Sequence, residues 1–242
     1  MQTIQLLEKN ALTDSLFHLR FSRPKHWNYQ AGQFARIGLA LNGGEPVFRA
    51  YSMSSNPIEP TLDFLIKRVE GGTLSPTLTG LEVGAEVLLD GEAEGNLLPS
   101  RIPGGDTMWF FATGAGLAPF LSLLKDPDAI SEWDTVILAL SARGVKEVDA
   151  LADAAIQTNH KKLRILTTTT REPSPLEGRI TTLIESGKIE ELAEHKLVPE
   201  SARTMLCDNP DFIKEMRALL KARGLISPRF GNPGQLLVES LW

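Results

Sequence analysis

Two patterns of hydrophobic and polar positions follow each other along the chain and divide it near residue 101. The first part carries short stretches of alternating or apolar residues, separated by turn sequences rich in Gly, Pro and Asn. These stretches are 14–22, 32–41, 49–55, 62–69 and 85–93. Short strands joined by such turns are typical of antiparallel all-β domains. We therefore expect residues 1–101 to form one antiparallel β-domain.

The second part alternates apolar strands with amphipathic helical stretches. Strands are expected at 107–113, 134–142, 163–170 and 202–207, and helices at 117–125, 148–157, 180–194 and 212–224. Strands that alternate with helices form right-handed βαβ units, which build a parallel sheet covered on both faces. We therefore expect residues 102–242 to form a doubly wound α/β domain, with the boundary in the Pro- and Gly-rich stretch 97–106.

Composition excludes several classes of protein. A formal net charge of −5 over 242 residues disfavours nucleic acid as the main partner. The single cysteine, Cys207, predicts neither a disulfide framework nor a thiolate metal cluster, so we expect no metal and a reducing, cytoplasmic location. No stretch reaches the roughly 18 apolar residues of a membrane span, and the first residues lack the apolar run of a signal peptide.

The stretch 48–55, "FRAYSMSS", has an unusual composition for a strand. Side chains alternate between the two faces of a strand, so Arg49 and Tyr51 share one face while Ala50 and Ser52 share the other. A cation, a flat ring and several small hydroxyls are therefore gathered at one strand end. An edge strand with solvated polar side chains is the alternative interpretation.

The stretch 109–124, "WFFATGAGLAPFLSLL", places a small-residue turn between an apolar strand and a helix. The turn runs from Thr113 to Gly116, and Pro119 falls in the first turn of the helix. A helix N-terminus offers free N–H groups to a phosphate, and in a doubly wound sheet this turn lies where dinucleotides bind. Taken alone, the two glycines are equally compatible with a structural tight turn.

These two motifs occur in a fixed order with "GGTLSPTL", "LRILTTTTRE", "MLCDNPDFI" and the terminal "VESLW". In that order they resemble the ferredoxin–NADP⁺ reductase family, in its bacterial flavodoxin/ferredoxin branch. The resemblance implies an antiparallel Greek-key FAD-binding barrel at 1–101. A doubly wound parallel-sheet NADP(H)-binding domain would follow at 102–242, with a C-terminal tail that returns to the flavin.

The activity implied by the resemblance is electron transfer between NADPH and ferredoxin or flavodoxin. Hydride exchange would join nicotinamide C4 and flavin N5, and one-electron steps would reach the carrier. Two alternatives remain open from the residues. One is an oxygenase-linked or free-flavin NAD(P)H reductase, and the other is a flavin electron-transfer subunit without catalytic turnover.

The resemblance also assigns residues to FAD. Tyr51 would pack on the isoalloxazine, Arg49 would meet the pyrophosphate, and Ser52 would hydrogen-bond near N5. In the second segment, Thr73 and Ser75 would cap a helix that faces the pyrophosphate. The full predicted FAD set is Arg49, Ala50, Tyr51, Ser52, Gly71, Gly72, Thr73, Leu74, Ser75, Thr113 and Trp242.

The predicted NADP set comprises the glycine turn, three arginines after strands, and one carboxyl: Thr113, Gly114, Gly116, Pro119, Arg143, Arg171, Arg179 and Asp208. The arginines favour a 2′-phosphate and hence NADPH. Each alone could equally be a solvated loop residue. The resemblance places Ser52, Cys207 and Glu239 beside the hydride-transfer site. Asp208 departs from the glycine usual in the family, and a carboxylate there can weaken binding of an anionic dinucleotide.

The expected protein partner is ferredoxin, flavodoxin or both. These carriers are acidic, so we expect a transient electrostatic encounter with basic side chains near the flavin, and a monomeric reductase. The candidate docking residues are Lys25, Arg36, Lys67 and Arg68. Solvated surface residues without a partner are the alternative.

Overall fold

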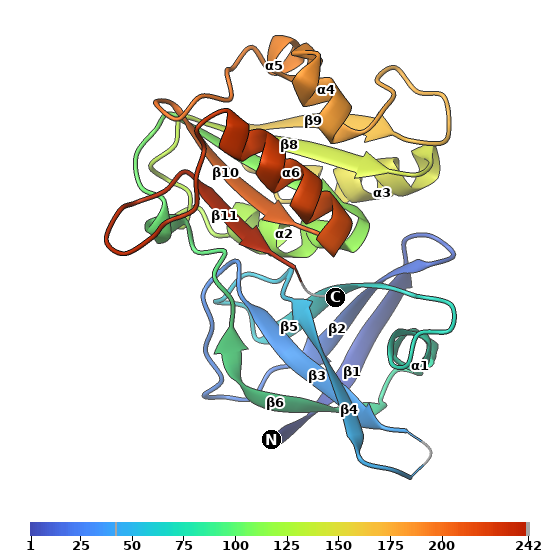
Figure 1. Cartoon of the computed structure of the whole chain (residues 1–242). Coiled ribbons are helices and arrows are strands. Elements are labelled where there is room, and N and C mark those ends of the chain that lie inside the picture. Colours follow the sequence, from blue (N-terminus) through green and yellow to red (C-terminus); the bar gives the residue numbers. More distant parts are fainter. Residues whose placement is uncertain (42, 241–242) are drawn as a thin grey trace.

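The computed structural model describes residues 1–41 and 43–240 (Figure 1). It consists of an antiparallel sheet built from the first part of the chain and a parallel sheet, flanked by helices, built from the second. The predicted fold class is therefore confirmed. The proposed domain boundary at residue 101 falls in the connection between the last strand of the first sheet and the first strand of the second.

The antiparallel sheet has six strands in the order β4-β3-β6-β1-β2-β5. Their bounds are β1 (Gln2–Ala11), β2 (Leu16–Ser22), β3 (Phe34–Ala40), β4 (Pro46–Ser52), β5 (Thr61–Lys67) and β6 (Glu86–Glu94), and the short helix α1 (Ser75–Gly80) follows β5. A bridge between Met53 and Phe64 connects the end of β4 to the opposite edge strand. The sheet therefore curls onto itself as a barrel.

Alternating apolar residues fill the barrel. Phe17, Leu19 and Phe21 of β2 point inward at every second position, and Phe21 meets Phe64 edge-on with ring centroids 6.0 Å apart. Leu16 and Leu65 point the other way and pack into the core of the parallel-sheet half. The two halves therefore share buried hydrophobic contacts.

The parallel sheet has five strands in the order β11-β10-β7-β8-β9. The strands are β7 (Thr107–Thr113), β8 (Thr135–Ala142), β9 (Leu163–Thr169), β10 (Ala202–Cys207) and β11 (Leu236–Glu239). The helices are α2 (Ala118–Lys125) and α3 (Val145–Ile156) on one face, and α4 (Ile180–Glu185), α5 (Lys188–Ala193) and α6 (Pro210–Ala222) on the other (Figure 1).

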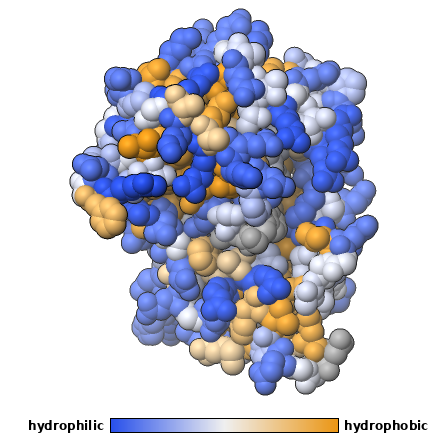
Figure 2. All heavy atoms as spheres, viewed as in Figure 1, coloured by the Kyte–Doolittle hydropathy of each residue, from blue (hydrophilic) through white to orange (hydrophobic). Residues whose placement is uncertain are grey.

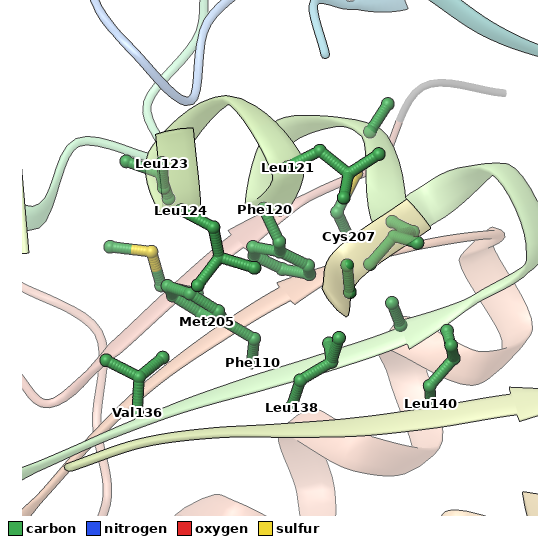
Figure 3. Packing of buried hydrophobic residues seen from close by; sticks show 14 of the residues in the cluster. Phe110, Phe120, Leu121, Leu123, Leu124, Val136, Leu138, Leu140, Met205 and Cys207 are labelled. Carbon is green, nitrogen blue, oxygen red and sulfur yellow. The ribbon is translucent and has the colours of Figure 1, made fainter. Parts of the chain in front are cut away.

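Helices on both faces explain why β7 is an unbroken apolar run. Met108 and Phe110 pack under α2, whereas Trp109 and Phe111 pack against the opposite helix layer. Phe110 stacks on Phe120 of α2 with ring centroids 4.5 Å apart (Figure 3). This packing fixes α2, and the turn before it, against the sheet.

The structure differs from the sequence prediction at three elements. The pattern did not indicate β1, in which Ile4 and Leu6 are the deeply buried residues, or β11, which has four residues. The helix expected at 180–194 is divided into α4 and α5. Gly187 takes φ +75° between them, a left-handed conformation that ends one helix before the next begins.

Hydrophilic residues cover much of both halves in the view of Figure 2. The apolar residues are gathered into one cluster inside the barrel and two clusters on the faces of the parallel sheet. Across the described part of the chain, no helix is both long enough and apolar enough to span a bilayer.

Candidate active site

The ends of β4 and of the parallel strands meet at a cleft between the two halves of the molecule. The barrel contributes Ala50, Tyr51, Ser52 and Leu65 to its lining. The parallel-sheet half contributes Ala115, Gly116, Ala118, Cys207 and Asp208. Residues predicted for FAD and residues predicted for NADP therefore line one cavity.

The end of β4 presents a cation and an aromatic ring. Tyr51 is half-buried and meets Phe64 edge-on, with ring centroids 6.5 Å apart. Burial raises the pKa of Tyr51 to about 12, so the phenol stays protonated. Arg49 is exposed and donates from Nη1 to the carbonyl of Phe48 at 2.7 Å. Its remaining donors are available for an anion.

The second predicted FAD segment forms a tight turn before α1. Gly71 has φ +72°, and a Cβ on Gly72 would lie 2.9 Å from the carbonyl oxygen of Val69, so both positions require glycine. Leu74 is buried in the barrel core, which leaves only its backbone for a ligand. These placements are compatible with close approach of a phosphate, which stays a prediction.

The expected helix cap in this segment is wrong. The N-cap of α1 is Leu74, and no side chain caps the helix. Thr73 is exposed, and the Ser75 hydroxyl accepts instead from the backbone N–H of Val69 at 3.1 Å. Because the helix begins at residue 75 itself, the Ser75 hydroxyl bonds to the preceding turn and does not cap the helix.

The glycine turn after β7 approaches β10 very closely. Thr113 ends β7, Gly114 takes φ +51°, and a short 3₁₀-helix, Gly114–Leu117, leads into α2 with Pro119 in its first turn. A Cβ on Gly116 would lie 2.1 Å from the carbonyl oxygen of Cys207. The glycine is therefore required by the backbone of the neighbouring strand end.

Three predicted catalytic residues come together at the cleft. Cys207 and Glu239 are paired in register at the ends of β10 and β11. The Oγ atom of Ser52 lies 4.0 Å from the Sγ atom of Cys207, across the junction of the two halves. All three side chains are buried. Burial, followed by the negative charge of Glu239, raises the pKa of the Cys207 thiol, which is therefore neutral.

Glu239 is a buried carboxyl with an incomplete set of hydrogen bonds. Its Oε2 accepts from the backbone N–H of Asn96 at 3.3 Å, while Oε1 has no partner among the described residues. Burial raises the pKa of Glu239 to about 7, against the opposing hydrogen bonds of Asn96 and Ser52. This carboxyl can therefore hold or release a proton near neutral pH.

Asp208 follows Cys207 and faces the same cleft. Its Oδ1 accepts from the backbone N–H and from Nδ2 of Asn209, at 2.5 and 2.6 Å. Its Oδ2 is buried and has no partner within the described chain. Burial raises the pKa of Asp208, and the nearby donors of Thr113 and Asn209 act in the opposite direction. Each of the two carboxyls therefore has one buried acceptor that lacks a donor among the described residues.

The three predicted arginines lie beyond the carboxyl ends of β8 and β9. Arg143 and Arg171 are exposed neighbours, joined by a backbone hydrogen bond of 3.0 Å from the N–H of Arg171 to the carbonyl of Arg143. Arg179 precedes α4 and its Nη1 forms an ion pair with Glu215 at 3.2 Å. Within residues 1–41 and 43–240, no ion pair involves Arg143 or Arg171.

Comparison with known proteins identifies the family of this chain. Residues 3–96 match the oxidoreductase FAD-binding domain family. The ferredoxin–NADP reductase A of Sorangium cellulosum is 37% identical over 97% of this chain and 87% of its own length. The ferredoxin–NADP reductase of Azotobacter vinelandii is 34% identical over 97% of this chain and 95% of its own length. The chain belongs to the ferredoxin–NADP reductase family.

A solved structure agrees with this assignment. A ferredoxin NADP⁺ reductase from Neisseria gonorrhoeae, with bound FAD and NADP, superposes with a TM-score of 0.92 at 33% identity. The superposition covers 99% of this chain and 98% of that one. The predicted family resemblance is thereby confirmed.

Sequence reasoning missed the contacts that join the two halves of this family member. The carbonyl of Ser55 accepts from Ser122 of α2 at 2.6 Å, and the carbonyl of Ser54 accepts from Lys125 Nζ at 2.8 Å. Asn56 donates to the Lys125 carbonyl. The hydroxyl-rich end of "FRAYSMSS" could have signalled this, because small polar residues let two backbones approach. The last residues of the motif, Ser54 and Ser55, therefore hold α2 in position instead of binding a ligand.

A second missed contact involves a residue proposed for docking. Lys67, at the end of β5, forms an ion pair of 2.7 Å with Glu147 in the first turn of α3. Glu147 carried no signal in the sequence, because one carboxylate in a helical stretch is ordinarily solvated. The predicted FAD contact of Trp242 lies outside the described residues.

Proposed function

We propose that this protein is a FAD-dependent ferredoxin–NADP⁺ reductase that transfers electrons between NADPH and ferredoxin or flavodoxin. The observation that carries the proposal is the single cleft in which Tyr51 and Ser52 of the barrel meet Gly116 and Cys207 of the parallel sheet. Membership of the reductase family and the FAD and NADP bound by the Neisseria gonorrhoeae relative support the same conclusion.

The residues at the cleft fit FAD. The ring of Tyr51 offers an aromatic surface, the exposed guanidinium of Arg49 offers donors for a pyrophosphate, and the turn at Gly71 and Gly72 allows close backbone approach. When bound, FAD supplies hydride exchange with a nicotinamide and release of single electrons. The protein contributes position and electrostatics.

Burial shifts the ionisation of the chain's own polar groups near the transfer site. The thiol of Cys207 keeps its proton, and the carboxyl of Glu239 has a pKa of about 7. Ser52 and Cys207 are buried and exclude water from the wall between the two halves. Glu239 is the group placed to exchange a proton there, and this role is part of the proposal.

A preference for NADPH follows from the arginines. Arg143 and Arg171 are adjacent at the carboxyl edge of the sheet, where a dinucleotide binds in a doubly wound domain. Two guanidinium groups without an acidic partner among the described residues suit the doubly charged 2′-phosphate. Arg179 would have to leave Glu215 to join them.

The names of the relatives and the basic side chains of the barrel bear on the protein partner. Relatives are named as reductases of ferredoxin and, in Rhodobacter capsulatus, of flavodoxin or ferredoxin. Of the proposed docking cations, Lys67 pairs with Glu147, Arg36 pairs with Asp90, and Arg68 lies over the ring of Phe17. The exposed Lys25 is not engaged in an ion pair within the described residues.

We infer a transient, electrostatic encounter of a monomeric, cytoplasmic reductase with its carrier. Raising the ionic strength from about 0.1 M to about 1 M shortens the Debye length from about 10 Å to about 3 Å. Carrier reduction should therefore slow with added salt, while flavin reduction by NADPH without the carrier changes less. Equal sensitivity of both steps would contradict the electrostatic encounter.

The direct test of the function is spectroscopic. The purified protein should hold FAD without a covalent bond, and anaerobic NADPH should bleach its visible absorbance. Addition of oxidised ferredoxin or flavodoxin should then restore the absorbance as electrons leave the flavin. A folded protein that cannot be reconstituted with FAD would end the proposal. The Arg49→Ala variant should retain FAD less well, and Lys25→Ala serves as a control in the same domain.

The same experiment distinguishes the alternatives. A free-flavin reductase would pass electrons to added flavin faster than to either carrier. The structural likeness to a ferredoxin reductase of carbazole 1,9a-dioxygenase, at 23% identity and a TM-score of 0.76, concerns the fold alone. A subunit without turnover would bind FAD and remain oxidised in NADPH.

A further inference from the structure

Asp208 has the properties of a binding group that lacks its ligand. Its side chain is only 4% exposed and lines the cleft beside Cys207 and Gly116. Both hydrogen bonds from Asn209 go to Oδ1, and the buried Oδ2 has no partner among the described residues. A buried carboxylate oxygen without a donor is costly, so a ligand that compensates it would gain binding energy.

The local backbone supports a negative charge at this position. Asp208 directly precedes Asn209, the N-cap of the thirteen-residue helix α6. The partial positive charge of a helix N-terminus and the nearby donors of Thr113 and Asn209 stabilise a carboxylate. Burial acts in the opposite direction and raises the pKa of Asp208. A cation bound in the cleft would lower the pKa of Asp208 and so favour its charged form.

Among the ionisable groups at this end of the sheet, Asp208 is the carboxyl that lines the cleft itself. Burial raises the pKa of the Cys207 thiol, and it raises the pKa of Glu239 to about 7. The phenol of Tyr51, on the opposite wall, is protonated because burial raises its pKa to about 12. A ligand in the cleft would therefore meet the carboxyl of Asp208 directly, with the partly ionised Glu239 as the other acidic group at this end of the sheet.

The proposed substrate changes its charge at the ring that enters this cleft. The nicotinamide of NADP⁺ is a pyridinium cation, whereas the dihydronicotinamide of NADPH is neutral. A hydride that leaves C4 for the flavin takes two electrons and one proton and leaves the positive charge on the ring. The phosphates are the same in both forms, so only a group near the ring can discriminate by charge.

We propose that Asp208 discriminates between the cationic and the neutral nicotinamide ring and strengthens binding of oxidised NADP⁺ relative to reduced NADPH. This inference rests on the proposed reductase function and adds to it a specificity-determining residue. A carboxylate that stabilises the charge developing on the ring also favours hydride donation from NADPH. The carboxylate of Asp208 repels the phosphates of either dinucleotide. Its attraction to the cationic ring offsets that repulsion for NADP⁺ only.

The test measures equilibrium binding rather than turnover. FAD-loaded wild type and the Asp208→Asn variant are titrated with three probes. These are NADP⁺, with a cationic ring; tetrahydro-NADP, whose saturated ring is neutral and cannot reduce the flavin; and 2′,5′-ADP, which has no nicotinamide. Asp211→Asn is the matched control, because Asp211 lies exposed in the first turn of the same helix.

We expect Asp208→Asn to weaken NADP⁺ binding about tenfold, the size of one charge-assisted contact. Binding of tetrahydro-NADP and 2′,5′-ADP should weaken less than about twofold or improve, because they lose only repulsion. Asp211→Asn should leave all three affinities unchanged. The Asp208→Gly variant, which carries the residue usual in the family, should show the same selective loss and serves if the amide variant fails to retain FAD.

Three outcomes would overturn the inference. Equal losses for NADP⁺ and tetrahydro-NADP would mean that Asp208 acts as an uncharged hydrogen-bond acceptor or a spacer. Unchanged affinities would mean that the ring does not approach it. A selective loss in Asp211→Asn as well would indicate a general surface effect. A wild type that binds none of the probes would instead refute the reductase function on which the inference rests.

Discussion

The Sγ atom of Cys207 lies 4.0 Å from the Oγ atom of Ser52, although 155 residues separate them along the chain. Ser52 ends the barrel strand β4, and Cys207 ends the parallel strand β10. This contact marks the place where the two halves of the chain complete one cleft.

The thiol of Cys207 should be unreactive in the folded protein. It is 3% exposed, and burial raises its pKa, so the nucleophilic thiolate is scarce. Ellman's reagent should label the native protein far more slowly than the urea-unfolded protein at the same pH. Because the chain contains one cysteine, labelling reports on this site alone. Rapid labelling of the native state would contradict the buried position.

Glu239 should make stability depend on pH. The pKa of its carboxyl is about 7 in the folded chain against 4.5 as the reference value. Below pH 4.5 the carboxyl is protonated in both states, and its contribution to stability is fully present. As the pH rises through about 7, the unfolded chain releases the proton more readily, and up to about 3 kcal/mol is lost.

The Glu239→Gln variant removes this ionisation. Urea unfolding across the range from about pH 5 to about pH 9 should show the variant gaining stability relative to wild type as the pH rises. A stability difference between the two proteins that stays constant with pH would show that Glu239 titrates normally. The comparison is made on both proteins in the same FAD-bound state.

Gly116 should not tolerate a side chain. The Cβ of an alanine would lie 2.1 Å from the carbonyl oxygen of Cys207, and neither backbone can move without disturbing the sheet. Gly116→Ala should lower the free energy of unfolding by more than about 2 kcal/mol and weaken dinucleotide binding. Gly80→Ala is the control, because nothing lies within 4 Å of that Cβ. Its effect should stay within about 1 kcal/mol.

Arg143 and Arg171 should determine the preference for NADPH over NADH. Replacing both by Ala removes two charge-assisted contacts worth about 1.5–3 kcal/mol each, so kcat/KM should fall far more with NADPH than with NADH. Arg164→Ala is the control, because Arg164 lies near the start of β9, at the opposite edge of the sheet. Equal losses with both dinucleotides would remove these arginines from the 2′-phosphate site.

The ion pair between Lys67 and Glu147 should couple the two halves energetically. The side chains of Lys67 and Glu147 are 29% and 17% exposed, so solvent screens this ion pair less than it screens a pair on the surface. A double-mutant cycle with Lys67→Met and Glu147→Gln should give a coupling energy of about 1 kcal/mol. The exposed pair of Lys188 and Glu191 should give only a few tenths of that value. A coupling near zero would make the contact incidental.

The elements that the sequence predicted well are those whose pattern reflects burial. The run 107–113 is apolar at almost every position because β7 is covered on both faces, and the alternation in 14–22 reflects one face inside the barrel. Strand β1 escaped notice because only Ile4 and Leu6 are deeply buried, and pairing with β2 and β6 stabilises the rest. Such pairing is a tertiary property that a local pattern does not carry.

The residues of the candidate site were predictable from the sequence, but the hydrogen bonds among them were not. The motifs identified Ser52, Cys207 and Asp208, but the free Oδ2 of Asp208 depends on where Asn209 directs its donors. The expected cap by Ser75 failed because a hydroxyl near a helix start has several backbone donors within reach. Side-chain hydrogen bonds of this kind are decided by angles that sequence spacing does not determine.

The contacts between the barrel and α2 limit how such an enzyme can be recombined. A chimera joined between the two halves separates the partners of these hydrogen bonds. The barrel side holds Ser54, Ser55 and Asn56, and the other side holds Ser122 and Lys125. A chimera that takes its nucleotide-binding half from a distant reductase would mismatch these hydrogen bonds and the packing of Leu16 and Leu65 into the core of the other half. Exchange of coenzyme preference among relatives is therefore easier by point substitution at the strand ends than by swapping whole halves.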